Sequence, residues 1–304
     1  MKPLSVFKLM FLAAALLIGT LAMSCGGDDK PSGGSSGSSA PPAATAKPSF
    51  PVGSTMDTIV KRGKIVVGVK YDVPLFGLLD PVSRKVDGLD VAFGKAIAAE
   101  LGLQENQVEF IEAISANRIP YLQEDKADLI ISTMTINADR KTQVEFARPY
   151  YLAGQSILVK KSDTSIKTVD DLNGKRVCSA QGSTSETNVK AKAPSVQLLS
   201  LQTYSACVSS MKDGRVDAVT TDDIILAGFA NTDKDLKLVG GVFTTEAYGI
   251  AMKKGKTDMQ KFVDDLLTKM LADGRWEKLY NQYLGAVEGF PKSGEAKTKL
   301  PAAA

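Results

Sequence analysis

Residues 127–149 read ADLIISTMTINADRKTQVEFARP, and this stretch decides the predicted fold. An apolar run, Leu129 to Ile131, predicts a short buried strand, and the hydroxyl-rich segment 132–135 follows where that strand ends. Asn137 can cap a short helix that carries Arg140. An arginine fork beside the free N–H groups of a helix start suits a small carboxylate. For an arginine without further context, a solvated surface cation is the plain alternative.

The first 24 residues predict a processing segment. Two lysines precede an apolar core, residues 9–22, which has signal-peptide length and is too short for a comfortable membrane span. Small residues then lead to Cys25, an arrangement that resembles a bacterial lipoprotein signal; an ordinary secretory signal is the alternative. The resemblance implies that residues 1–24 are removed and that a lipid on Cys25 holds the protein on the outer side of a membrane.

Two further segments have little to bury. Residues 25–53 are rich in Gly, Ser, Pro and Ala, and we expect a lipid-anchored flexible tether there. Residues 291–304 at the other end are polar, and we expect a disordered tail.

Composition excludes several classes of protein. The formal charge falls from +3 to +1 without residues 1–24, so no general attraction to nucleic acid follows. The absence of histidine excludes Ser-His-Asp and Cys-His nucleophilic sites and histidine-ligated metals. The sequence also contains no Walker loop, dinucleotide-binding glycine fingerprint, CxxC pair or acidic calcium loop. We therefore expect neither a metal nor a cofactor.

Apolar strands and amphipathic helices alternate in two successive sets. The first set spans residues 54–149 and the second spans residues 155–245. The segments YLQEDKADLIISTMT and SSMKDGRVDAVTTDD follow the same plan of helix end, polar turn, Asp, strand and threonine-rich strand end. Two α/β lobes are the simplest prediction. Ligands of open α/β sheets bind beyond the carboxyl ends of strands, so both threonine-rich ends should face one cleft.

The chain is expected to cross between the lobes twice. The crossings fall at residues 150–154 and 246–250, where they would form a two-segment hinge that permits closure around a ligand. Residues 251–290 would return to the first lobe as C-terminal helices.

Five segments together resemble the polar amino acid binding proteins of ABC importers. These are GVKYDVPLFGLLD, DGLDVAFGKAIAAELG, ANRIPYLQEDKADLIISTMTINADRKTQVEFARPYYLAGQSILV, DLNGKRVCSAQGSTS and GRVDAVTTDDIILAG. The resemblance covers nearly all of residues 58–284, and its most specific part is residues 128–154. It implies a two-lobed periplasmic-binding-protein-like fold (type II), and the nearest likeness is to aspartate/glutamate-binding members.

The resemblance also implies ligand contacts. Arg140, helped by Thr135, matches the arginine that pairs with the ligand α-carboxylate. Asp222 matches the carboxylate partner of the α-ammonium group. The other implied contacts are the backbone acceptors at Ser132 and Thr133 and the second-lobe loop of Gly182, Ser183 and Thr184.

The choice of ligand is expected to depend on two further cations. Arg118 matches an arginine that members with acidic ligands use for the distal carboxylate, and Lys70 matches a lysine at the same end of the cleft. Unpaired buried cations are costly, so acidic amino acids are favoured over glutamine. A surface lysine is the alternative for Lys70. Leu89 stands where members often have Phe or Tyr, and it would give apolar cover without stacking.

Cys178 and Cys207 are the cysteines left after the processing segment and Cys25. An even count outside the cytoplasm favours a disulfide, with two buried free thiols as the alternative.

The leading hypothesis is a monomeric, lipid-anchored, extracytoplasmic receptor. It would capture L-glutamate or L-aspartate and deliver the amino acid to an ABC permease. Asparagine and glutamine are further candidate ligands. One rival is an enzyme similar to cyclohexadienyl dehydratases, which act on prephenate or arogenate, and another is the ligand-sensing subunit of a signalling system. Asp223 is the alternative carboxylate for the cleft, but Asp222 is favoured because it stands at the strand end, whereas Asp223 is typical of a helix start.

Overall fold

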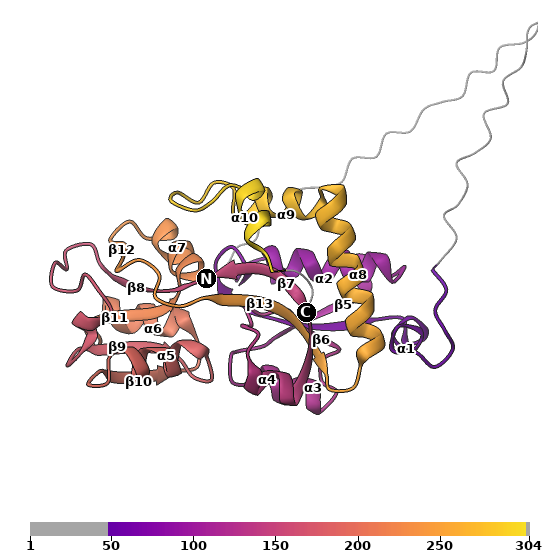
Figure 1. Ribbon diagram of the computed structural model, residues 1–304, viewed down its shortest axis with the longest axis horizontal. Coiled ribbons are helices and arrows are strands. Elements are labelled where there is room, and N and C mark those ends of the chain that lie inside the picture. Colours follow the sequence, from indigo (N-terminus) through magenta and orange to yellow (C-terminus); the bar gives the residue numbers. More distant parts are fainter. Residues whose placement is uncertain (1–47, 302–304) are drawn as a thin grey trace, which may run out of the picture. The chain divides into compact units, whose positions relative to one another are not determined.

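The computed structural model describes residues 48–301, and this range contains two five-stranded sheets (Figure 1). Each sheet has its own covering helices, which confirms the prediction of two α/β lobes. Residues 1–47 and 302–304 lie outside the described residues, and with them the expected processing segment, Cys25 and most of the expected tether.

The first sheet has the strand order β5-β1-β6-β13-β7. β1 pairs in parallel with β5 and β6, whereas β13 is antiparallel to β6 and β7. β1 lies inside the sheet, between β5 and β6, and this explains its uninterrupted apolar sequence IVVGV, since such strands are covered on both faces. The strands are β1 (Ile65–Val69), β5 (Val108–Glu112), β6 (Leu129–Ile130), β7 (Val144–Ala153) and β13 (Glu246–Lys253).

Helices of the first lobe begin and end at residues that the sequence marks. Ser54 accepts a hydrogen bond from the Asp57 N–H at 3.1 Å, and Gly63 ends the same helix in the left-handed conformation. The helices are α1 (Thr55–Arg62), α2 (Leu89–Glu100), η1 (Glu105–Gln107), α3 (Arg118–Gln123), α4 (Ala138–Gln143), α8 (Thr257–Asp273), α9 (Arg275–Tyr283) and α10 (Ser293–Lys299). A small antiparallel sheet adds β2 (Asp72–Val73), β3 (Gly77–Leu79) and β4 (Val86–Asp87).

The second sheet has the order β10-β9-β11-β8-β12. β9 is parallel to β10 and β11, and β8 is antiparallel to β11 and β12. Its elements are β8 (Gln155–Lys160), η2 (Asp170–Leu172), β9 (Arg176–Ala180), α5 (Thr184–Lys192), β10 (Gln197–Leu201), α6 (Tyr204–Lys212), β11 (Ala218–Asp222), α7 (Asp223–Thr232) and β12 (Leu236–Val239).

A disulfide joins Cys178 on β9 to Cys207 on α6, with the two Cα atoms 5.4 Å apart. The predicted pairing is therefore confirmed. The bond fixes a helix to the sheet that it covers, within one lobe.

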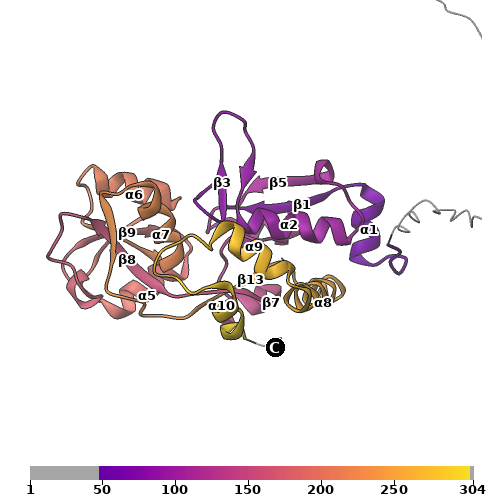
Figure 2. The same cartoon turned by 90° about the horizontal axis from the view of Figure 1, so that it is seen from above.

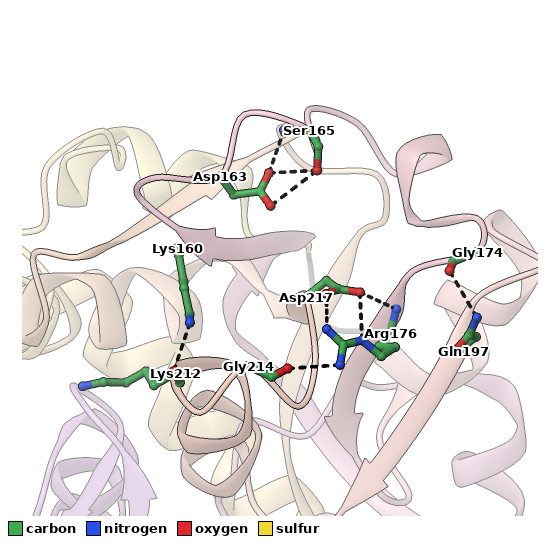
Figure 3. Close-up of polar contacts among 9 residues, drawn as sticks. All are labelled: Lys160, Asp163, Ser165, Gly174, Arg176, Gln197, Lys212, Gly214 and Asp217. Carbon is green, nitrogen blue, oxygen red and sulfur yellow. Dashed lines mark hydrogen bonds and ion pairs between the residues drawn. The ribbon is translucent and has the colours of Figure 1, made fainter.

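The amino ends of β9 and β11 are held by an ion pair (Figure 3). The Arg176 guanidinium pairs with the Asp217 carboxylate, and Arg176 Nη1 also donates to the Gly214 carbonyl at 3.0 Å. Lys160 Nζ donates to the carbonyl of Lys212 at the end of α6, at 3.0 Å. These contacts lie at the amino ends of β9 and β11, away from the carboxyl ends where α/β sheets bind ligands, so we assign them to the support of the lobe.

Two long strands carry the chain from one lobe to the other (Figures 1 and 2). β7 and β13 pair in antiparallel fashion from Glu246 opposite Ala153 to Lys253 opposite Val144. A single residue, Gly154, separates the end of β7 from the start of β8 in the second sheet, at Gln155. The segments 150–154 and 246–250, expected as the hinge, thus lie in or beside this strand pair.

Two expected boundaries are wrong at the ends of the described chain. The tether was expected to reach residue 53, but the Phe50 ring packs edge-on against Phe262 with centroids 5.7 Å apart. The tail from residue 291 was expected to be disordered, but it contains α10. Ala296 in α10 and Leu300 directly after this helix both pack against the main core, and these two apolar contacts are hidden in an otherwise polar sequence.

Among residues 48–301, no helix combines the length and the apolar character that crossing a bilayer requires.

Candidate ligand-binding site

The predicted site residues lie where strand ends from both lobes meet. β6 in the first lobe leads into residues 132–135, and β9 and β11 in the second lobe lead into residues 181–184 and Asp222. Direct hydrogen bonds join the two groups across the lobes.

Arg140 is positioned by its short helix. The Asn137 side chain accepts a hydrogen bond from the Arg140 N–H at 2.9 Å, so the expected N-cap of α4 is confirmed. The buried guanidinium donates from Nη1 to the Thr135 carbonyl at 2.7 Å and from Nη2 to the Gly182 carbonyl at 3.3 Å. Arg140 therefore reaches from the first lobe to the loop of the second.

Arg118, the first residue of α3, is also buried and reaches the same carbonyl. Its Nη2 lies 3.5 Å from the Gly182 oxygen, while Nη1 donates to the carbonyls of Ser132 and Thr133 at 3.1 and 3.2 Å. Burial, followed by repulsion from Arg140, lowers the pKa of Arg118 to about 9, so the side chain stays charged at neutral pH. The guanidinium thus occupies backbone acceptors that the resemblance gives to the ligand ammonium group.

The site contains a carboxylate oxygen with no partner. Asp222 is 4 % exposed; its Oδ2 accepts a hydrogen bond from the Tyr248 hydroxyl at 2.6 Å, whereas Oδ1 has no hydrogen-bond partner within residues 48–301. Burial and the nearby Glu246 charge raise the pKa of Asp222 to about 8. Asp223, the neighbouring acid, instead accepts from the Gly154 N–H at 3.2 Å and the Ile224 N–H at 2.8 Å. Asp222 is therefore the carboxylate with free hydrogen-bonding capacity.

Lys70 lies directly after β1 and is 1 % exposed. Its Nζ donates to Ser115 Oγ at 2.8 Å and stands 5.4 Å from the centre of the Tyr204 ring. None of the ion pairs within residues 48–301 includes Lys70. Burial and repulsion from Arg118 lower the pKa of Lys70 to about 7. The surface-lysine alternative is wrong.

Ser132, Thr133 and Leu89 are engaged within the first lobe, Thr133 through its backbone. Ser132 Oγ donates to the Ala113 carbonyl at 2.8 Å, and Leu89 is buried in the main hydrophobic core. The Thr133 N–H donates to Asp90 Oδ2 at 3.0 Å, with a φ of 43° that L-residues rarely adopt. Asp90 thus fixes the backbone that turns toward Arg118.

The loop of the second lobe approaches the first lobe closely. Gly182 has a φ of +76°, and a Cβ there would lie 2.9 Å from the Cα of Ala116, so only glycine fits without a shift. Ser183 caps α5 through its hydroxyl. Thr184 Oγ1 lies 3.4 Å from Thr135 Oγ1, a contact between the lobes.

Residues 65–286 match the family of bacterial extracellular solute-binding proteins, family 3. The chain belongs to this family. Family 3 solute-binding proteins similar to it include the "ABC transporter glutamine-binding protein GlnH" of Bacillus subtilis (strain 168), 42 % identical over 76 % of this chain and 84 % of the relative. The "Glutamate-binding protein GluB" of Corynebacterium glutamicum is 38 % identical over 74 % of this chain and 80 % of the relative.

A solved structure supports the same assignment. "An ancestral arginine-binding protein bound to glutamine" has a TM-score of 0.70 and 39 % identity, and covers 74 % of this chain and 99 % of its own. The first relative is named for an ABC transporter and for glutamine, and the second is named for glutamate; this chain shares with them the family of bacterial extracellular solute-binding proteins.

Sequence reasoning missed two buried acids in this family 3 protein, Asp90 and Glu246. Asp90 accepts the Tyr150 hydroxyl at 2.6 Å in addition to the Thr133 N–H. Glu246 accepts hydrogen bonds from a hydroxyl group of each lobe, those of Thr135 and Thr184. Each acid begins or nearly begins a regular element, in DGLDVAF and TTEAYGI, inside an otherwise apolar or hydroxyl-rich run. An acid in such a run is the signal that could have identified them, because buried acids require partners.

Proposed function

We propose that the protein captures an acidic amino acid, L-glutamate or L-aspartate, and delivers it to an ABC permease. Arg140 binds the α-carboxylate, and Asp222 Oδ1 binds the α-ammonium group. Support comes from the buried unpartnered oxygen of Asp222 and from the two guanidinium groups that converge on one carbonyl oxygen, a place suited to anionic oxygen.

The observation that carries the acidic preference is the buried amine of Lys70, which a carboxylate beside it would keep protonated. It makes one hydrogen bond, to the neutral Ser115 hydroxyl, and has no carboxylate partner within residues 48–301. A distal carboxylate would compensate its charge, whereas an amide oxygen would only accept a hydrogen bond. Arg118 acts mainly through the backbone carbonyls that it orders.

Calorimetric titration of a Lys70→Met variant tests this role. Affinity for glutamate should fall at least about tenfold, because truncation of one partner of a buried charge pair costs about 2–5 kcal/mol, while affinity for glutamine should change little. Lys192→Met on the exposed side of α5 is the control. An equal loss of affinity for glutamate and glutamine would show that Lys70 does not determine which ligand binds.

The glutamine-binding relative makes glutamine the second candidate ligand. The dehydratase alternative predicts turnover of prephenate or arogenate by the purified protein, and our proposal predicts none. A signalling role predicts that the protein, when purified from membranes, carries with it a partner protein other than a permease.

We further propose that ligand binding closes the lobes about residues 150–154 and 246–250, that the protein acts as a monomer, and that Cys25 carries the lipid anchor. Arg140 from one lobe and Asp222 from the other would both contact one ligand, which favours the closed form. A Cys25→Ala variant should lose incorporation of labelled fatty acid and leave the membrane fraction; retention of both would contradict the anchor.

A further inference from the structure

Glu246 is a buried carboxylate at the crossing between the lobes. It is the first residue of β13, pairs with Ala153 of β7 and is 2 % exposed. Four side chains donate to it. Oε2 accepts from Thr135 Oγ1 at 2.6 Å and Thr184 Oγ1 at 2.9 Å, and Oε1 accepts from Asn188 Nδ2 and Thr244 Oγ1, each at 2.8 Å.

The donors come from different lobes. Thr135 follows β6 in the first lobe, where a β-bridge to Tyr248 holds its backbone. Thr184 and Asn188 lie one turn apart on α5 in the second lobe and both point to the same carboxylate. Because a carboxylate only accepts hydrogen bonds, Glu246 requires several donors when buried, and in this arrangement of the lobes four side chains supply them.

The same residues hold the arginines of the site. The carbonyl of Thr135 accepts from Arg140, while its hydroxyl donates to Glu246. Gly182, whose carbonyl accepts from Arg118 and Arg140, stands two residues before Thr184. Glu246 therefore fixes, through Thr135 and Thr184, the backbone on both sides of the Arg140 guanidinium.

We propose that Glu246 is a positioning residue that couples closure of the lobes to the alignment of Arg140 with Asp222. The ligand does not need to touch Glu246. Its hydrogen bonds to Thr184 and Asn188 form as α5 approaches, and they bring the second-lobe loop onto the guanidinium that Thr135 already holds. The inference rests on the proposed amino acid site but is independent of the side chain that the ligand carries.

This coupling can be measured with a double-mutant cycle on the full chain, with Glu246→Gln, Thr184→Val and the combined variant. Calorimetry with L-glutamate and L-glutamine gives the affinities. Glu246→Gln should lower the affinity for both amino acids by the same factor, at least about tenfold, because hydrogen bonds to a charged group are lost. The combined variant should lose little more than Glu246→Gln alone, since both changes remove one shared contact. Thr187→Val, on an exposed position of the same helix, is the matched control.

Small-angle scattering separates coupling from general damage to the fold. Saturating ligand should make the wild-type protein more compact, and Glu246→Gln should need a higher amino acid concentration for the same compaction. Unchanged affinity in Glu246→Gln or Thr184→Val, or fully additive losses, would overturn the inference. If Glu246→Gln does not fold, an unchanged affinity of Thr184→Val still overturns it, and a loss that Thr187→Val does not share supports it. A wild-type protein that binds neither amino acid would overturn the proposed function, and the inference with it.

Discussion

The Tyr248 hydroxyl donates to Oδ2 of Asp222 at 2.6 Å and leaves Oδ1 as a buried oxygen without a partner in the described chain. The tyrosine lies on β13 and the aspartate ends β11, so a strand that crosses between the lobes orients the carboxylate of the second lobe. Such a carboxylate is prepared for a donor that arrives from outside, and an amino acid α-ammonium group is a donor of the right charge.

Asp222→Asn should weaken the binding of every amino acid ligand by at least about 2 kcal/mol, because the ammonium group would lose its charged acceptor in a buried site. Calorimetry with a panel of amino acids measures the loss. Asp223→Asn is the matched control, since the asparagine oxygen can still accept from the Gly154 and Ile224 N–H groups. A larger loss of affinity in Asp223→Asn than in Asp222→Asn would show that Asp223, and not Asp222, binds the ammonium group.

Ligand binding should release protons near neutral pH. Burial and then Glu246 raise the pKa of Asp222 to about 8, and an ammonium group beside it would lower that pKa again, so affinity should fall as pH falls below 8. Glutamate should release fewer protons than glutamine, because its second carboxylate would raise the pKa of Lys70, which burial lowers to about 7, and protonate that amine. Titrations at pH 7 in buffers of different ionisation enthalpy measure both effects. Identical proton release for the two ligands would contradict the placement of the distal carboxylate beside Lys70.

Stability without added ligand should respond to Asp90. Burial raises its pKa from 3.8 to about 7, so between these values the folded protein holds a proton that the unfolded chain releases. The contribution of Asp90 to the free energy of unfolding therefore falls as pH rises through this range. Asp90→Asn should flatten the dependence of the melting temperature on pH between 3.8 and about 7. Parallel curves for the two proteins would show that Asp90 does not titrate in this range.

Gly182→Ala should lower both stability and affinity. The left-handed conformation costs an alanine about 1–2 kcal/mol, and its Cβ would meet the Ala116 Cα of the other lobe at 2.9 Å. Gly174→Ala is the matched control, because Gly174 has a φ of +75° with no atom within 4 Å of the added Cβ. We expect similar strain in both variants and about a tenfold loss of affinity only in Gly182→Ala. Equal affinities would mean that this close approach is not needed for binding.

Sequence reasoning reached the strands, the helices and the disulfide because each has a local signal. The apolar run of β1, the Asn137 cap and the even cysteine count are examples. Motifs predicted ligand contacts at Arg118, Arg140, Lys70 and Asp222, and the structure brings both arginines onto the carbonyl of Gly182.

The remaining features depend on contacts between distant segments, which local patterns do not encode. The hydroxyl of Thr135 meets Glu246 across 111 positions of the chain, and Asp90 meets Thr133 across 43. Arg118 was expected to face the ligand directly, but its hydrogen bonds to Ser132 and Thr133 depend on how α3 packs on the end of β6. The order of α10 likewise depends on core contacts of Ala296 and Leu300 that a polar composition conceals.

The most direct test of the central claim is the ratio of affinities of the unmodified protein for L-glutamate and L-glutamine, measured by calorimetry at neutral pH. The buried Lys70 amine, which a distal carboxylate would protonate and pair with, predicts that glutamate, or its shorter homologue aspartate, binds at least about tenfold more tightly than glutamine. Tight binding of glutamine together with no measurable binding of glutamate or aspartate would contradict it.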